Sequence, residues 1–162
     1  MTRLPGALCA FAACAAAGAA RAARLRDREA RLESWDAALR RMKAAAETGA
    51  LPLPRILRSA GGNATLLTGA EMLEKDPGME PDAWLAALPK EEKLPPDIRA
   101  LLREALLSLF DYPARRQAQG LEKCIAELAP LRRREKEKNE KGAALALRLG
   151  VLAGAALFIL LC

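Results

Sequence analysis

The chain contains few of the side chains that usually perform catalysis. It has no histidine, and histidine is both a common general base and the commonest metal ligand in proteins. Three of its four cysteines lie in the apolar ends of the sequence, and none forms a CxxC pair. These cysteines are Cys9, Cys14, Cys124 and Cys162. The spacing predicts reduced thiols and neither a disulfide nor a metal site.

Carboxylates are the remaining candidates for chemistry. Five of them lie near one another in the acidic middle of the chain: Glu71, Glu74, Asp76, Glu80 and Asp82. Carboxylates can hold a hard cation or transfer protons, but these lack the spaced Asp, Gly and Glu residues of a calcium loop. A solvated acidic face explains them more simply, and a membrane-bound enzyme that uses them stays an alternative.

Two other motifs have plain structural interpretations. The sequence GGNATLLTGAE from Gly61 lacks the Gly-Lys-Ser/Thr ending with which a phosphate loop holds phosphate and magnesium. Arg132, Arg133 and Arg134 alternate into glutamates with no aromatic residue nearby, which is not typical of a nucleic-acid surface. We therefore predict no enzyme, no cofactor and no nucleic-acid partner.

The composition predicts an all-α fold. Of the 162 residues, 52% are apolar but only 4% are aromatic, and Val151 is the only valine. A sheet needs β-branched and aromatic residues that this chain lacks. Alanine, leucine, arginine, glutamate and lysine dominate instead, and these residues lose little on entering a helix. The length allows one compact domain of ordinary size.

Charge is distributed so that each end of the chain is apolar and each apolar end adjoins a basic block. Residues 142–162 carry one charge, Arg148, near their start. As a helix they would extend roughly 32 Å, against about 30 Å of bilayer hydrocarbon. We predict a transmembrane helix over 142–162.

The first segment, residues 4–20, is uncharged but mostly alanine, so it is a marginal membrane helix. A cleaved signal peptide or a lipoprotein box ending at Cys14 is the alternative, which would give a processed lipoprotein or a secreted helical protein. Both would need a basic region before the apolar run, whereas here Arg3 stands alone before it and the other arginines follow it.

The positive-inside rule places both basic flanks in the cytoplasm. The flanking residues are Arg21, Arg24, Arg26, Arg28, Arg132, Arg133 and Arg134. We therefore expect residues 21–141 to form a cytosolic helical domain and both termini to lie outside.

Within 21–141, apolar stripes predict packed helices. Leu25, Leu32, Trp35, Leu39, Met42 and Ala46 form one stripe, which continues the first segment, and residues 98–109 form another. Further helices are expected over 55–60, 63–75 and 81–88, and from Pro113 onward with a kink at Pro130. Trp35 and Trp84 are the predicted core anchors.

Small residues recur every fourth position in the last segment: Gly142, Ala146, Gly150 and Gly154. Such a stripe lets two membrane helices approach closely. We expect it to pack on another helix, either the first segment of this chain or a partner subunit. A similar pattern runs from Gly6 to Gly18.

Several stretches resemble one family, the stage III sporulation protein AB of endospore-forming bacteria. They are WDAAL from Trp35, GALPLPRIL from Gly49, WLAAL from Trp84, Gln117, and the last 25 residues from Lys138. Phe110, Pro113, Pro130 and the alanine-rich first segment depart from the family's pattern.

The resemblance implies a non-enzymatic part of the channel apparatus that joins mother cell to forespore, with its soluble domain in the mother cell. The family is similar to the inner-membrane platform proteins of type II secretion systems. The implied partners are other stage III sporulation proteins, including a cytosolic ATPase.

Overall fold

The computed structural model describes residues 3–49, 51–89, 94–110 and 113–161. Residues 90–93 and Cys162 lie outside the described residues. Every regular element among the described residues is an α-helix, which confirms the all-α prediction. The helices are α1 (Arg3–Glu47), α2 (Leu53–Ser59), α3 (Ala64–Lys75), α4 (Pro81–Ala87), α5 (Pro96–Ser108) and α6 (Ala114–Leu161).

The contacts divide the chain into two units, not the one compact domain that its length suggested. Unit 1 consists of residues 1–30 and 133–162, and unit 2 of residues 31–132. The helices α1 and α6 contribute to both units. The packed unit 2 thus lies within the 21–141 stretch for which we predict a cytosolic location.

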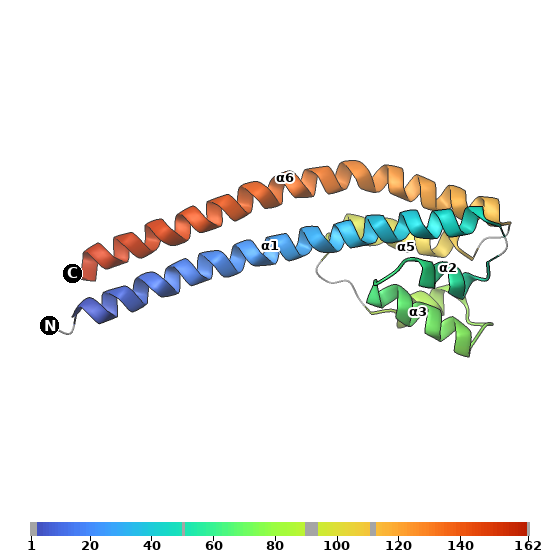
Figure 1. Ribbon diagram of the computed structural model, residues 1–162, viewed down its shortest axis with the longest axis horizontal. Coiled ribbons are helices and arrows are strands. Elements are labelled where there is room, and N and C mark those ends of the chain that lie inside the picture. The colour runs from blue at the N-terminus through green and yellow to red at the C-terminus, as the bar shows by residue number, and fades with distance from the viewer. Residues whose placement is uncertain (1–2, 50, 90–93, 111–112, 162) are drawn as a thin grey trace. The chain divides into compact units, whose positions relative to one another are not determined.

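Unit 1 is a pair of helices. The first part of α1 and the last part of α6 run side by side in opposite directions, as the blue and red ends of the ribbon show in Figure 1. Small residues form the contact: Gly18, Ala22, Ala143, Ala146 and Gly154 are all buried. The beginning of α1 and the end of α6 therefore lie at the same end of this pair.

Unit 2 has a leucine-rich core to which all six helices contribute. The predicted stripes supply much of it, since Leu39, Met42, Leu121 and Leu128 have no exposed surface. From α5, the residues Ile98, Leu101, Leu102, Ala105 and Leu106 are buried. Burial of these apolar faces is the main source of stability for helices this short.

Local signals explain where the helices of unit 2 begin and end. The Asn63 side chain accepts a hydrogen bond from the Leu66 amide at 3.3 Å, which caps the N-terminus of α3. Pro81 and Pro96 occupy the first position of α4 and α5, where a missing amide hydrogen costs nothing. Gly49 has φ +79°, a left-handed conformation that ends α1.

One helix boundary differs from the sequence-based expectation. The helix α2 begins at Leu53, so Pro54 occupies its first turn instead of preceding it. The helix α6 runs through Pro130 as one element, as predicted, and the kink at Pro130 stays a prediction. Pro130 is exposed, so the backbone carbonyl that loses its hydrogen bond there can be satisfied by water.

Candidate functional site

The last part of α6 is long and apolar enough to cross a membrane. Only 17% of its most apolar window is buried inside the structure, which argues against a core helix. Several of its large side chains are exposed, including Leu145, Leu149, Leu152, Ile159 and Leu160. This surface indicates membrane association.

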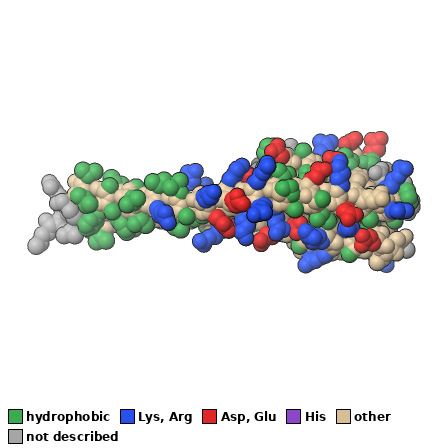
Figure 2. Space-filling model, turned by 90° about the horizontal axis from the view of Figure 1, so that it is seen from above, with side chains coloured by type: hydrophobic (Ala, Val, Ile, Leu, Met, Phe, Trp, Pro, Cys, Tyr) green, Lys and Arg blue, Asp and Glu red, His purple; other side chains and the backbone are tan. Residues whose placement is uncertain are grey.

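The first segment does not meet the same test. Among the described residues, α6 is the one helix whose length and composition suit a crossing. Because α1 is rich in alanine, it has less apolar area per turn than α6. A membrane crossing by the first segment therefore stays a prediction. Figure 2 shows hydrophobic side chains over the part of unit 1 where α1 begins and α6 ends, and Lys and Arg side chains farther along the same helix pair.

The two helices of unit 1 approach closely at glycines. A Cβ atom built on Gly18 would lie 2.7 Å from the carbonyl oxygen of Ala146 and 3.2 Å from Cα of Gly150. One built on Gly150 would lie 3.0 Å from the carbonyl oxygen of Cys14. Side chains larger than hydrogen therefore do not fit here without moving the helices apart.

The rest of the small-residue stripe also faces α1. A Cβ atom on Gly154 would lie 2.9 Å from a ring carbon of Phe11, and one on Gly142 would lie 3.2 Å from a methyl carbon of Leu25. Ala146 is 9% exposed. The structure thus brings Ala146, Gly150 and Gly154 onto the first segment of the same chain, and Gly142 onto Leu25 just after that segment.

A polar band follows the apolar part of unit 1. Arg28 pairs with Glu135 at 3.7 Å, and Lys136 pairs with Glu29 at 3.4 Å. Asn139 is 4% exposed, and its Nδ2 atom makes no hydrogen bond to a described residue. A buried asparagine between two helices is a known device for setting their register.

The predicted membrane-flanking arginines have different environments. Arg21, Arg24 and Arg26 on α1 are exposed, as are Arg133 and Arg134 on α6. Their positions allow contact with phospholipid headgroups.

Arg132 instead forms an ion pair within unit 2. Its Nη1 atom lies 2.9 Å from a carboxylate oxygen of Asp36 on α1. Arg40 donates to the same carboxylate at 3.0 Å, and Asp36 is only 8% exposed. A largely buried carboxylate held by two arginines ties α1 to α6. This role of Arg132 was not predicted from the sequence, although the i, i+4 spacing of Asp36 and Arg40 is a usable signal.

Both tryptophans are buried in unit 2. Trp84 has no exposed surface, and its Nε1 donates a hydrogen bond to the Gly69 carbonyl at 2.9 Å. Its ring meets Phe110 edge to face with centroids 5.3 Å apart. Trp35 is 2% exposed. Phe110, one of the departures from the family pattern, therefore has a packing partner.

Two of the acidic residues of the middle segment, Glu74 and Asp82, make surface ion pairs. Glu74 accepts two hydrogen bonds from Arg58, at 2.9 and 2.7 Å, and Asp82 pairs with Arg103 at 3.2 Å. The hydrogen bonds from Arg58 lower the pKa of Glu74 below its usual value. Within the described part of the chain, no cluster of His, Cys, Asp or Glu suits a metal ion.

Comparison with known protein families identifies a match over nearly the whole chain. The family model of stage III sporulation protein AB matches residues 3–162. No curated protein and no solved structure matches the chain.

Proposed function

Because the chain belongs to the stage III sporulation protein AB family and so has a sporulation-related role, we propose that it is a structural membrane subunit of the sporulation channel complex. In this proposal it is not an enzyme. Its helix pair anchors it in the mother-cell membrane, and unit 2 is a cytosolic platform for partner proteins. The partners include other stage III proteins and a cytosolic ATPase.

The observation that carries the proposal is the glycine contact in unit 1. Membrane helices gain no hydrophobic energy by meeting, because lipid is as apolar as their side chains. Close backbone approach provides the attraction instead, and Gly18 against Gly150 allows it. A helix pair whose outer surface is apolar has the features expected of a membrane anchor.

The same contacts support retention of the first segment. Phe11, Cys14 and Gly18 each lie against a glycine of α6. Cleavage near residue 20 would remove these partners and expose the small-residue face of α6. We therefore propose two crossings, with the basic flanks and unit 2 in the cytoplasm and both termini outside.

The charged groups of unit 2 support a structural role over catalysis. Asp36 is held by arginines, and Glu74 and Asp82 lie in exposed ion pairs. Cys124 is buried, and burial raises its pKa to about 12, so it is a poor nucleophile at neutral pH.

A replacement experiment in the source bacterium tests the proposal. The chromosomal gene is exchanged for one encoding Gly150→Leu with Gly154→Leu, and heat-resistant spores are counted. We expect the variant protein to remain in the membrane fraction while the spore count falls at least tenfold. Gly6→Leu is the matched control, because a side chain at Gly6 meets open space.

Normal sporulation with the double leucine variant would overturn the idea that this helix pair matters for the complex. Normal sporulation after deletion of the whole gene would overturn the proposed function itself.

A further inference from the structure

Unit 2 contains two adjoining cavities that share three lining residues. The first has a volume of about 340 Å³ and the second of about 390 Å³. Trp35, Thr65 and Pro89 line both, so the cavities form one groove that passes the edge of the Trp35 side chain. A volume of this size accommodates one or two large side chains.

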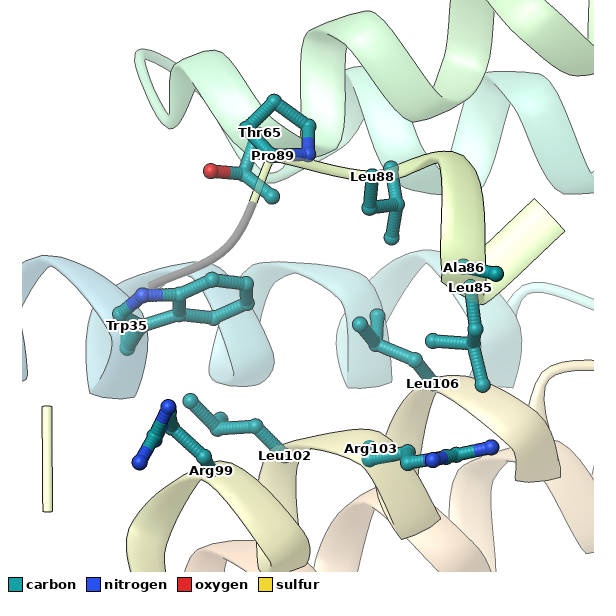
Figure 3. Close-up of a pocket in the computed structure, with 10 residues that line it drawn as sticks. All are labelled: Trp35, Thr65, Leu85, Ala86, Leu88, Pro89, Arg99, Leu102, Arg103 and Leu106. Atoms are coloured by element: carbon teal, nitrogen blue, oxygen red, sulfur yellow. The ribbon is translucent and has the colours of Figure 1, made fainter. Parts of the chain in front are cut away.

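The walls of the first cavity are apolar. Figure 3 shows Trp35 from α1, Leu88 after α4, and Leu102 and Leu106 from α5 around the opening. Each of these side chains is at least nine-tenths buried, so their positions are set by the core of unit 2. The floor of the groove is therefore preformed and needs no rearrangement to receive an apolar group.

The rim of the same cavity is basic. Arg99 and Arg103 lie one turn apart on α5, and both are exposed (Figure 3). No aspartate or glutamate is among the described residues that line either cavity. The groove thus combines an apolar floor with positive charge at its edge.

One rim arginine already holds a carboxylate from the surface of unit 2. Arg103 pairs with Asp82 at 3.2 Å, and the two side chains are 63% and 80% exposed. An ion pair so exposed is worth at most about 1 kcal/mol, so a carboxylate from a partner can replace Asp82 at little cost.

From these observations we propose that the groove binds an acidic amphipathic segment of a partner protein. One large apolar side chain of the partner enters the cavity beside Trp35. A carboxylate about one turn away on the partner pairs with Arg99 or Arg103. Charge complementarity favours an acidic occupant, because Arg99 and Arg103 place positive charge at the rim.

The test uses the full chain in lipid nanodiscs and a displayed library of helical peptides with randomised exposed positions. Peptides that bind empty nanodiscs are removed first. We expect the enriched peptides to carry a large apolar residue with Asp or Glu one turn from it. The best peptide is then synthesised with a fluorescent label, and its affinity is measured by anisotropy.

Variants locate the site and check the role of charge. Arg99→Glu with Arg103→Glu should weaken binding about tenfold or more, because two rim pairs become repulsive. Arg116→Glu with Arg115→Glu gives the same charge change on α6 at positions that do not line the groove, and it should have little effect. Ala86→Phe should block the cavity mouth, whereas Ala100→Phe on α5 should not.

Asp82→Asn should give a result that misfolding of the variant cannot produce, namely stronger binding. Removing the competing carboxylate should strengthen binding about twofold to fivefold, in line with the energy of an exposed pair. A loss of stability could only weaken binding, so a gain identifies competition for Arg103.

The proposal fails if the enriched peptides lack carboxylates, or if the Arg99→Glu, Arg103→Glu variant binds them normally. It also fails if no peptide is enriched. In that case, arginine-dependent binding of dodecanoate would assign the groove to a lipid-like amphiphile, and arginine-dependent dimerisation would assign it to a second copy.

Discussion

Gly18 and Gly150 are in backbone contact across the two helices of unit 1. A Cβ atom on either glycine would lie 3.2 Å from the Cα atom of the other. Neither position has room for a side chain, and this contact brings the apolar faces of α1 and α6 together. It explains why a weakly hydrophobic, alanine-rich segment can still have a stable place beside α6.

Gly18→Leu should separate the two helices. The new side chain begins 2.7 Å from the Ala146 carbonyl oxygen, so it weakens the helix contact by about 1 to 3 kcal/mol. Spin labels at the exposed positions Leu8 and Ile159, in a background without native cysteines, report the separation as a broader and longer distance distribution. Gly6→Leu adds the same side chain in open space and should leave the distribution unchanged. An unaltered distance in Gly18→Leu would contradict the packing.

Trp35→Ala should strongly destabilise unit 2. The tryptophan is 2% exposed, and truncation of a buried aromatic residue costs about 3 to 5 kcal/mol. We expect the variant to lose cooperative thermal unfolding, which is measured by near-ultraviolet circular dichroism. Glu74→Gln, which removes an exposed ion pair, should change the midpoint little. A midpoint like that of the wild type for Trp35→Ala would show that the ring contributes to partner contact and not to the core.

Gly69→Ala should disturb the packing of the Trp84 side chain and its hydrogen bond. A Cβ atom at Gly69 would lie 2.7 Å from the indole Cζ2, and the same glycine accepts the Nε1 hydrogen bond. We expect a loss of about 1 to 3 kcal/mol in the free energy of unfolding, measured by denaturant titration with tryptophan fluorescence. For comparison, Gly78→Ala adds a methyl group at ordinary contact distance, 3.7 Å from Asp76, and should have little effect.

Cys124 should resist thiol reagents in the folded protein. Its side chain is 3% exposed, and burial raises the pKa of the thiol to about 12 from an ordinary value of 9.0. A raised folded-state pKa means that the neutral thiol favours folding below pH 9, and that this contribution disappears as the pH rises toward 12. With Cys9, Cys14 and Cys162 changed to alanine, labelling by a chromogenic disulfide reagent at pH 8 should require denaturant. Rapid labelling of the folded chain would show that α5 and α6 open at this point.

Sequence periodicity predicted the helices well, because each must bury an apolar stripe. Leu32, Leu39, Leu121 and Leu128 occupy the core positions that their spacing indicates. The spacing of glycines in the last segment also identified a close-packing face. The sequence left open which helix packs on these glycines, because any helix with a smooth face would fit. The structure places Gly18 and Phe11 of α1 against them.

The hydrophobic pattern of the sequence could not predict the long-range polar contacts. The Trp84 to Gly69 hydrogen bond joins residues 15 positions apart, and the Asp36 to Arg132 pair joins the first and last helices. Arg132 was assigned to the membrane flank because its neighbours are basic, and its ion pair depends on a helix packing that no local rule contains. The groove beside Trp35 likewise arises from residues of four separate segments.

Membrane topology is the feature on which the proposed function most depends. Paired alkaline phosphatase and green fluorescent protein reporters should be placed before Met1, in the exposed turn at Gly78 and after Cys162. We predict fluorescence without phosphatase activity at Gly78, and phosphatase activity without fluorescence at both ends. An exported signal at Gly78, or a cytoplasmic signal at either end, would contradict a two-helix anchor that carries a cytosolic platform.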